Sequence, residues 1–302
     1  MYDAIVIGGG PSGLSAALQL GRARRSTLVV DAGNPRNAAA TEVHGLIGLD
    51  GLSPAELRRR AVGELERYGV EHRSVSADRV EPDDDTFAVH LDGEVVQGRR
   101  VLLATGLVDV PPELPAADQF WGTAILQCPF CHGWEVADRP LGFVADAPED
   151  LDRVSFYGNW TSDLTVLTHG RFEVADEQRR NLEDSGVRVL EAEVTELHGE
   201  EGKLESVSLA DGSTVKCEAL FLHPAQQQTP VVQDLGVELN EGGFVVVEKD
   251  YGAPGGPQQV METSQSGVFA AGDLTSPAQS AVLATFEGSL AGQMILLSLL
   301  GV

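Results

Sequence analysis

The sequence predicts an α/β protein of two domains, the first built on a parallel sheet. Its 302 residues suffice for two domains of ordinary size, each with its own core. The N-terminal segment has the order strand, glycine turn, helix, strand, with the sequences YDAIVI (2–7), GGGPSG (8–13), LSAALQLGRA (14–23) and STLVVD (26–31). Its apolar runs are continuous, which is typical of strands buried on both faces of a parallel sheet.

The rest of the first domain follows from capping and turn residues. A helix is expected from Pro54, with Ser53 as its N-cap and an end at Gly69. Strands FAVHL and EVVQG flank an Asp92-Gly93 turn, and RRVLLATG (99–106) is a further buried strand. Residues 107–122 carry three prolines and little periodicity, so we interpret them as a linker.

A second unit is expected to run to about residue 244. Three strands are predicted at LGFVAD (141–146), RVSFYG (153–158) and LTVLTH (164–169), followed by a helix within 174–186 and a β-meander over 203–224. The Pro- and Gly-rich stretch 251–259 then leads to a strand at GVFAAGD (267–273) and a long helix of small residues from about Ala278.

Composition excludes several classes of protein. The 46 acidic and 21 basic residues give a net charge of −25, which argues against nucleic acid or an anionic membrane as partner. There is no run of eighteen apolar residues and no basic segment before the first strand, so we expect neither a membrane span nor a signal peptide. Three cysteines do not make a disulfide framework, and we expect a reducing, cytoplasmic location.

The glycine turn matches the GxGxxG pattern at Gly8, Gly10 and Gly13. It lies between a strand and a helix, and Asp31 ends the next strand 18 residues after Gly13. The glycines permit a tight turn and a close approach to a pyrophosphate at the helix N-terminus, and the acidic residue can bind a ribose hydroxyl. The turn therefore predicts a dinucleotide site, without deciding between FAD and NAD.

The sequence QCPFCHGWEV (127–136) holds Cys128 and Cys131 with His132 directly after them. A zinc site would need two more ligands, and the third cysteine, Cys217, lies in an apolar strand pattern, so we predict no metal. A static disulfide is unexpected in the cytosol, which favours a redox pair. Cys128 can cap a helix that starts at Pro129, where the helix dipole would lower its thiol pKa. His132 can carry the proton that thiol–disulfide exchange moves, and the alternative is a surface histidine without a chemical role.

The second acidic landmark, GVFAAGD, resembles flavoproteins with two dinucleotide-binding domains. The resemblance implies FAD as cofactor and two Rossmann-like domains of the dinucleotide-binding type. The FAD domain would comprise residues 1–112 and 245–302, with a degenerate NADPH-type domain that carries the CxxC pair inserted as residues 113–244. The FAD contacts that it implies are Gly8, Gly10, Pro11, Ser12, Gly13, Asp31, Ala32, His44, Ala104, Thr105, Gly106, Gly272, Asp273 and Ala281.

With TEVHGLIG (41–48) and the CxxC pair added, the whole chain resembles a low-molecular-weight thioredoxin reductase. That resemblance implies a homodimer, with Cys131 as the sulfur facing the flavin and Cys128 as the thiol that exchanges with substrate. The family usually has aspartate after the motif, where this chain has His132.

The second nucleotide site departs from the family pattern. After the strand at 141–146, the loop lacks glycine and carries acidic residues and a proline, namely Asp146, Pro148, Glu149, Asp150 and Asp152. Carboxylates at this position would repel a pyrophosphate, which binds to backbone amide groups that no side chain covers. The next strand ends in Thr168-His169-Gly170, with only Arg171 beyond it to meet a 2′-phosphate. The alternative is a loop that binds NADPH in an unusual way.

CPFCHGWE is most similar to the FAD-dependent dithiol oxidases that close the disulfides of gliotoxin and holomycin. This resemblance implies oxidation of a small-molecule or protein dithiol, with O2 as electron acceptor. Two alternatives stay open: a disulfide reductase fed by NADPH or another donor such as ferredoxin, and a non-catalytic flavin redox sensor.

Overall fold

The computed structural model describes residues 1–110, 112–248 and 260–301 of the chain. The chain divides into two compact units. Unit 1 comprises residues 1–38, 45–108 and 226–302, and unit 2 comprises residues 39–44 and 109–225. Two of the segments in which the chain passes between the units are β7 (Val108–Asp109) and β16 (Gln226–Gln227), and they pair with each other. The Pro- and Gly-rich stretch 251–259 that the sequence singled out lies outside the described residues.

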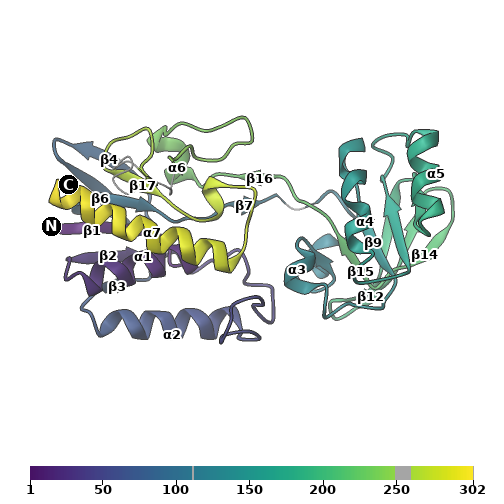
Figure 1. The fold of residues 1–302 in the computed structure, drawn as a ribbon, viewed down its shortest axis with the longest axis horizontal. Helices are drawn as coiled ribbons and strands as arrows, with labels where there is room; N and C mark the ends of the chain where they lie inside the picture. Colours follow the sequence, from purple (N-terminus) through teal and green to yellow (C-terminus); the bar gives the residue numbers. More distant parts are fainter. Residues whose placement is uncertain (111, 249–259, 302) are drawn as a thin grey trace. The chain divides into compact units, whose positions relative to one another are not determined.

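Unit 1 contains the N-terminal parallel sheet that the sequence predicts (Figure 1). Its strand order is β3-β2-β1-β6-β5-β4, with β17 beside β6. Strands β1, β2, β3, β6 and β17 run parallel, and β4 and β5 are antiparallel additions. The elements are β1 (Tyr2–Ile7), α1 (Pro11–Arg22), β2 (Thr27–Val30), α2 (Pro54–Glu66), β3 (Glu71–Arg73), β4 (Arg79–Asp83), β5 (Thr86–Leu91), β6 (Glu94–Leu103), α6 (Pro230–Leu235), β17 (Val268–Ala270), the 3-10 helix η3 (Asp273–Thr275) and α7 (Ala281–Leu300).

Alternating residues of β1 serve two different cores. Ala4 and Val6 pack with α1 and α7, whereas Ile5 and Ile7 pack with β4, β5 and α6. Residues 226–244 cluster with unit 1, although the sequence assigned them to the inserted domain. The reason is the core that contains Ile5 and Ile7, because Val231 and Val232 of α6 are buried in that core. Helix α2 begins as expected, with the Ser53 hydroxyl accepting a hydrogen bond from the Glu56 amide at 3.2 Å.

Helix α7 is long and apolar enough to cross a membrane by length and composition. It also packs along α1, and Figure 1 shows the two helices side by side. A Cβ added at Gly288 would meet the Ser12 carbonyl oxygen at 2.0 Å, and one at Gly292 would meet the Ala16 carbonyl oxygen at 2.7 Å. These contacts are those of a core helix in a globular domain, so glycine is required where the two backbones meet.

Unit 2 has a five-stranded parallel sheet of order β11-β10-β9-β15-β8 and an antiparallel sheet of order β12-β13-β14. The elements are η1 (Ala117–Gln119), β8 (Ile125–Leu126), α3 (Pro129–His132), β9 (Leu141–Val144), η2 (Pro148–Arg153), α4 (Val154–Tyr157), β10 (Leu164–Leu167), α5 (Asp176–Asp184), β11 (Arg188–Leu190), β12 (Val194–Glu200), β13 (Lys203–Leu209), β14 (Thr214–Lys216) and β15 (Ala219–Phe221). One core lies between the two sheets, and the other lies under α4 and α5.

Two expectations for unit 2 need correction. The predicted strand 153–158 is wrong, because those residues complete η2 and form α4. Val154 and Tyr157 are three residues apart and both buried, which is helical rather than alternating spacing. The predicted meander also ends earlier than expected, because β15 leaves it and joins the parallel sheet between β9 and β8.

Candidate active site

Three glycine-containing segments that are far apart in sequence meet in unit 1. Gly8 has a φ of +112°, and a Cβ there would meet the Ala104 carbonyl oxygen at 2.2 Å. The Ser12 hydroxyl donates to the Ala271 carbonyl oxygen at 2.9 Å, and Gly272 lies against the Ser12 side chain. The turn 8–13, residues 104–106 and residues 270–273 are therefore assembled as one surface, and their contact with FAD stays a prediction.

The turn itself has the form of a phosphate site. Gly10 is the N-cap of the twelve-residue helix α1, Pro11 is its first residue, and no side chain caps the helix. A Cβ added at Gly10 would meet nothing within 4 Å, whereas one at Gly13 would meet the Gly8 carbonyl oxygen at 1.9 Å. Gly13 thus serves the tight turn, and Gly10 leaves open space in front of the first amides of α1. These residues fit a dinucleotide pyrophosphate.

Asp31 lies at the next strand end and against this turn. A Cβ added at Gly9 would meet its carboxylate at 2.5 Å. One carboxylate oxygen accepts a hydrogen bond from the Gly33 amide at 3.3 Å, and the other forms an ion pair with Arg58. Ala32 follows as an exposed residue. Sequence reasoning missed Arg58, which neutralises the acidic residue expected to bind ribose.

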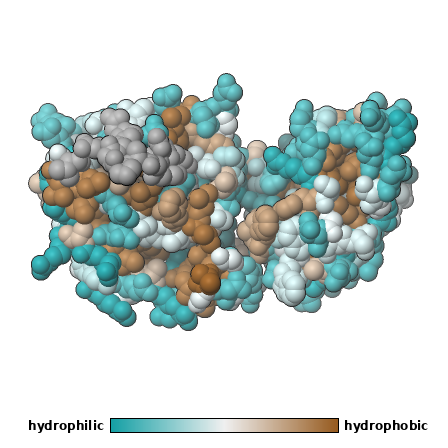
Figure 2. Space-filling model, in the orientation of Figure 1, coloured by the Kyte–Doolittle hydropathy of each residue, from teal (hydrophilic) through white to brown (hydrophobic). Residues whose placement is uncertain are grey.

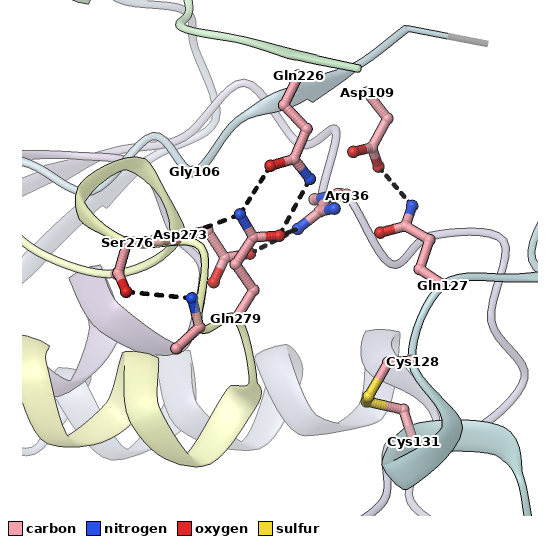
Figure 3. Close-up of polar contacts among 12 residues, drawn as sticks. Arg36, Gly106, Asp109, Gln127, Cys128, Cys131, Gln226, Asp273, Ser276 and Gln279 are labelled. Carbon is pink, nitrogen blue, oxygen red and sulfur yellow. Dashed lines mark hydrogen bonds and ion pairs between the residues drawn. A yellow bond between two sulfur atoms is a disulfide. The ribbon is translucent and has the colours of Figure 1, made fainter. Parts of the chain in front are cut away.

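The C-terminal landmark is held by residues that sequence reasoning also missed. Arg36 donates to the Asp273 carboxylate at 3.1 Å and to Gln279, and Gln279 pairs with Gln226 (Figure 3). Glu287 of α7 is 2% exposed. One of its oxygens accepts from the Gly272 amide at 2.8 Å and from the Thr275 hydroxyl at 2.9 Å. A charged residue inside a helix of small and apolar residues was the available signal for Glu287.

The redox pair is formed in unit 2. Cys128 is the N-cap of α3, Pro129 is the first helical residue, and Cys131 follows one turn later, as expected. The two cysteines are disulfide-bonded, with Cα atoms 5.2 Å apart (Figure 3). Helix α3 is a single turn, so its dipole is weaker than that of a long helix, and the effect on the Cys128 thiol stays a prediction.

His132 is half-buried beside the disulfide, at the end of α3. Burial lowers the pKa of its imidazole, and the neighbouring Glu135 carboxylate opposes that change. Neither ring nitrogen has a hydrogen-bond partner among the described residues. Both nitrogens are buried, so His132 is a candidate proton acceptor whose access to an incoming thiol stays a prediction.

Of the remaining predicted site residues, Thr105 and Gly106 follow Ala104 at the assembled surface of unit 1, and Ala281 is the first residue of α7. His44, in contrast, clusters with unit 2, where its Nε2 lies 3.3 Å from Glu135 and 3.4 Å from Glu42. Its role toward a cofactor stays a prediction.

Cys217 is buried, its thiol donates to the Ala219 carbonyl oxygen, and burial raises its pKa to about 12.

The carboxyl edge of β9 in unit 2 corresponds to the position of the turn 8–13 in unit 1. Here the Asp150 carboxylate accepts hydrogen bonds from the amides of Asp146 and Ala147 at 2.9 and 3.0 Å. Arg171, the one cation that follows β10 directly, forms an ion pair with Asp146. The amides and the cation that would contact phosphate are thus both bound to side chains of the chain itself.

Comparison with known proteins identifies the family. The profile of the pyridine nucleotide-disulphide oxidoreductases matches residues 2–158 and 165–288. The chain belongs to this family. Within the pyridine nucleotide-disulphide oxidoreductases it is an oxidoreductase of the low-molecular-weight thioredoxin reductase-like flavoproteins, which typically bind FAD.

Relatives and solved structures extend the match over the full length. The thioredoxin reductase sirT of Leptosphaeria maculans is 32% identical, and the alignment covers 100% of this chain and 95% of sirT. The crystal structure of HlmI is 34% identical with a TM-score of 0.89, covering 99% of this chain and 92% of HlmI. An oxidoreductase from Agrobacterium tumefaciens has the same identity and TM-score and covers 99% of both chains.

Proposed function

We propose that this protein is a FAD-dependent dithiol oxidase that forms a disulfide in a small-molecule or peptide substrate. The observation that carries the proposal is the Asp150 carboxylate on the amides of Asp146 and Ala147. A nucleotide pyrophosphate would have to displace this carboxylate and then lie beside it, and like charges at such distances repel. The reactive pair is intact, so electrons would enter from a dithiol rather than from NADPH.

The proposed reaction is two successive thiol–disulfide exchanges. A substrate thiol loses its proton to His132 and attacks the sulfur of Cys128, which forms a mixed disulfide and releases Cys131 as a thiolate. His132 passes this proton to Cys131 and then takes the proton of the second substrate thiol, which attacks the substrate sulfur of that mixed disulfide. Cys128 is released and receives this second proton from His132. The substrate leaves as a disulfide, and the protein holds a dithiol. When bound, FAD would take the two electrons of this dithiol and pass them to O2, giving hydrogen peroxide.

The residues that fit FAD are those assembled in unit 1. The amides at Gly10 and the start of α1 would hold the pyrophosphate, because that space is open and uncapped. Asp31 would receive the adenosine ribose, and the Gly272-Asp273 loop, supported by Glu287, would receive the ribityl–phosphate part.

The relatives favour a second candidate, since several carry the name thioredoxin reductase. In that case the same disulfide would be reduced by NADPH, or by another donor such as ferredoxin, and would pass electrons outward. A non-catalytic flavin sensor is the third possibility, and turnover with any dithiol in air would rule it out.

One anaerobic experiment separates these functions. The FAD-loaded protein is mixed either with millimolar NADPH or with dithiothreitol, and flavin absorbance is followed in a stopped-flow instrument. We expect dithiothreitol to bleach the flavin and NADPH to fail, and we expect admitted O2 to restore the spectrum with formation of peroxide. Rapid bleaching by NADPH would overturn the oxidase and favour the reductase. If the oxidised flavin spectrum returns only slowly in air, the dithiol reaction stands and the electron acceptor is a molecule other than O2.

We also propose a homodimer in the cytoplasm, without nucleic-acid or membrane partners. The low cysteine content and the net charge of −25 support the location and the excluded partners. The dimer is supported by family resemblance and by large apolar side chains exposed on α7, among them Val282, Leu297 and Leu300. Figure 2 has hydrophobic surface over this helix.

A further inference from the structure

Unit 2 contains a cavity of about 200 Å³ at the carboxyl ends of its parallel strands. Val144, the last residue of β9, and Leu222, directly after β15, both line it. In the strand order β11-β10-β9-β15-β8, the chain leaves β9 toward β10 on one side, whereas β15 lies on the other side of β9. The cavity therefore lies at the point where the strand order reverses, which is where open α/β sheets bind their ligands.

The cavity is too small for a dinucleotide. Pockets for drug-sized ligands usually measure about 300–1,000 Å³, whereas a cavity of about 150 Å³ can hold benzene. A volume of about 200 Å³ therefore fits a single ring with a small substituent. Phosphate is disfavoured at the same edge, because the Asp150 carboxylate already accepts the hydrogen bonds of the Asp146 and Ala147 amides.

The walls of the cavity are apolar and already in place. Leu114, Val144 and Leu222 line it and are buried. Val110 and Ala225 also line it, and the Val110 amide donates a hydrogen bond to the Ala225 carbonyl oxygen at 2.8 Å. These two residues directly follow β7 and directly precede β16, so the pairing of the two strands holds this side of the cavity. An apolar ring could therefore bind without the cost of ordering the walls first.

The charged groups of the lining favour a cation. Glu113 and Asp146 are exposed carboxylates, and Arg171 is already paired with Asp146. Partial burial lowers the pKa of the His223 imidazole, so this side chain is uncharged near pH 7. The Glu113 charge is therefore the one that no other lining residue balances, and a positively charged group on a ligand would balance it.

We propose that this cavity is a binding site for a small monocyclic cation, such as a benzylic amine or an aromatic amidine. The ring would lie against Leu114, Val144 and Leu222, and the positive charge would lie beside Glu113. None of the lining residues belongs to the cysteine pair or to the surface expected to hold FAD. The site thus goes beyond the proposed dithiol chemistry and uses the edge of unit 2 where a nucleotide would otherwise bind.

Three probes of nearly equal shape separate the effect of charge from that of the ring. At about pH 7.5 benzamidine is a cation, benzamide is neutral and benzoate is an anion. Their dissociation constants for the FAD-loaded protein are measured by ligand-detected NMR. We expect benzamidine to bind about 2- to 5-fold more tightly than benzamide, which is the strength of one solvent-exposed ion pair, and benzoate to bind most weakly. Absence of saturable benzamidine binding, or tightest binding of benzoate, would overturn the proposal.

Variants locate the bound probe. Glu113→Gln should remove the preference for benzamidine over benzamide. Glu205→Gln is the matched control, since it removes the same charge from an exposed side chain outside the cavity lining, and it should bind all probes like the native protein. Ala225→Phe, which adds a ring to the lining from an exposed position, should weaken the binding of all three probes. Native binding in both Glu113→Gln and Ala225→Phe would mean that the probe binds elsewhere, and the proposal would fail.

Competition with NADPH separates this site from a nucleotide site. We expect millimolar NADPH to leave benzamidine bound, because the cavity is small and the amides at its edge are occupied. Displacement of benzamidine would make the cavity part of a working nucleotide site and would overturn both this proposal and the oxidase. If benzamidine binds as expected and no dithiol is turned over, the cation site stands and the proposed function fails.

Discussion

At the scale of single residues, proton transfer in the proposed reaction depends on His132. Replacing it with Ala should lower turnover about 10²- to 10⁴-fold, because no other base follows the cysteine pair directly. His198→Ala is the matched control, since that ring lies on β12 and bonds to the Ser208 hydroxyl. Native turnover in His132→Ala would show that His132 is a surface histidine without a chemical role. His132→Asp tests whether the residue usual in the reductases can replace it.

The pH profile follows from the direction of the His132 pKa shift. Burial lowers this pKa, so the imidazole is neutral, and able to accept a proton, already below the usual histidine range. The rate at a fixed concentration of protonated substrate thiol should therefore be constant near neutral pH and fall as the pH drops through the lowered pKa. A fall that begins above about pH 7 would contradict the shift, since it would require a raised pKa.

The three cysteines should differ in reactivity in the folded protein. After reduction of the Cys128–Cys131 disulfide, titration with a chromogenic disulfide reagent should find two fast thiols. Cys217 should react only on unfolding, because it is buried and its pKa is raised to about 12. Turnover should be lost in Cys128→Ser and Cys131→Ser and retained in Cys217→Ser. A third fast thiol would show that the core around Cys217 opens.

At the scale of elements, the FAD surface depends on the contact between α1 and α7. Gly288→Ala would place a methyl group 2.0 Å from the Ser12 carbonyl oxygen, so α7 must move away from the glycine turn. We expect the free energy of unfolding to fall by about 1–3 kcal/mol and the FAD content to drop. Gly63→Ala on α2 is the control, since a Cβ there meets nothing, and it should be neutral or stabilising. Calorimetry and flavin absorbance after desalting measure both effects.

Glu287 offers a narrower test of the same surface. Its carboxylate is the buried acceptor for the Gly272 amide and the Thr275 hydroxyl. The hydroxyl also has the Gly272 carbonyl oxygen as acceptor, so Glu287→Ala leaves the Gly272 amide unsatisfied. The dissociation constant for FAD should rise about tenfold, whereas Glu287→Gln, which keeps an acceptor oxygen, should stay near native. Equal affinity in native protein and Glu287→Ala would mean that the Gly272 loop does not depend on this support.

Sequence patterns predicted the elements whose cause is local. The strand–turn–helix at residues 2–22, the Ser53 cap and the Cys128 cap all follow from residues within one turn of each other. The prediction failed at 153–158, because this apolar run is too short for its periodicity to distinguish a strand from a helix. These residues are helical and pack against the parallel sheet in the core of unit 2. The supports of the site, Arg36, Arg58, Glu287 and Asp150, act through contacts that only the fold creates. No spacing rule could assign their partners.

At the scale of the whole molecule, the assembly is the remaining prediction. Four large apolar side chains on α7 are at least 37% exposed, namely Val282, Phe286, Leu297 and Leu300, and burial of such a stripe against a second copy would stabilise a dimer. With a net charge of −25 on each chain, two copies repel each other. Screening reduces that repulsion, because the Debye length falls from about 30 Å at 0.01 M salt to about 8 Å at 0.15 M. The dimer should therefore tighten as salt is added, as expected where apolar contact opposes charge repulsion.

Sedimentation equilibrium at 0.01, 0.15 and 0.5 M NaCl measures this assembly directly. Leu297→Glu should raise the dimer dissociation constant at every salt concentration, because it places a charge in the apolar stripe. Leu239→Glu is the matched control, since that side chain is 42% exposed elsewhere in unit 1, and it should dimerise like the native protein. If Leu297→Glu dimerises as tightly as Leu239→Glu, α7 is not the interface. If salt weakens the dimer, ion pairs rather than apolar contacts hold it.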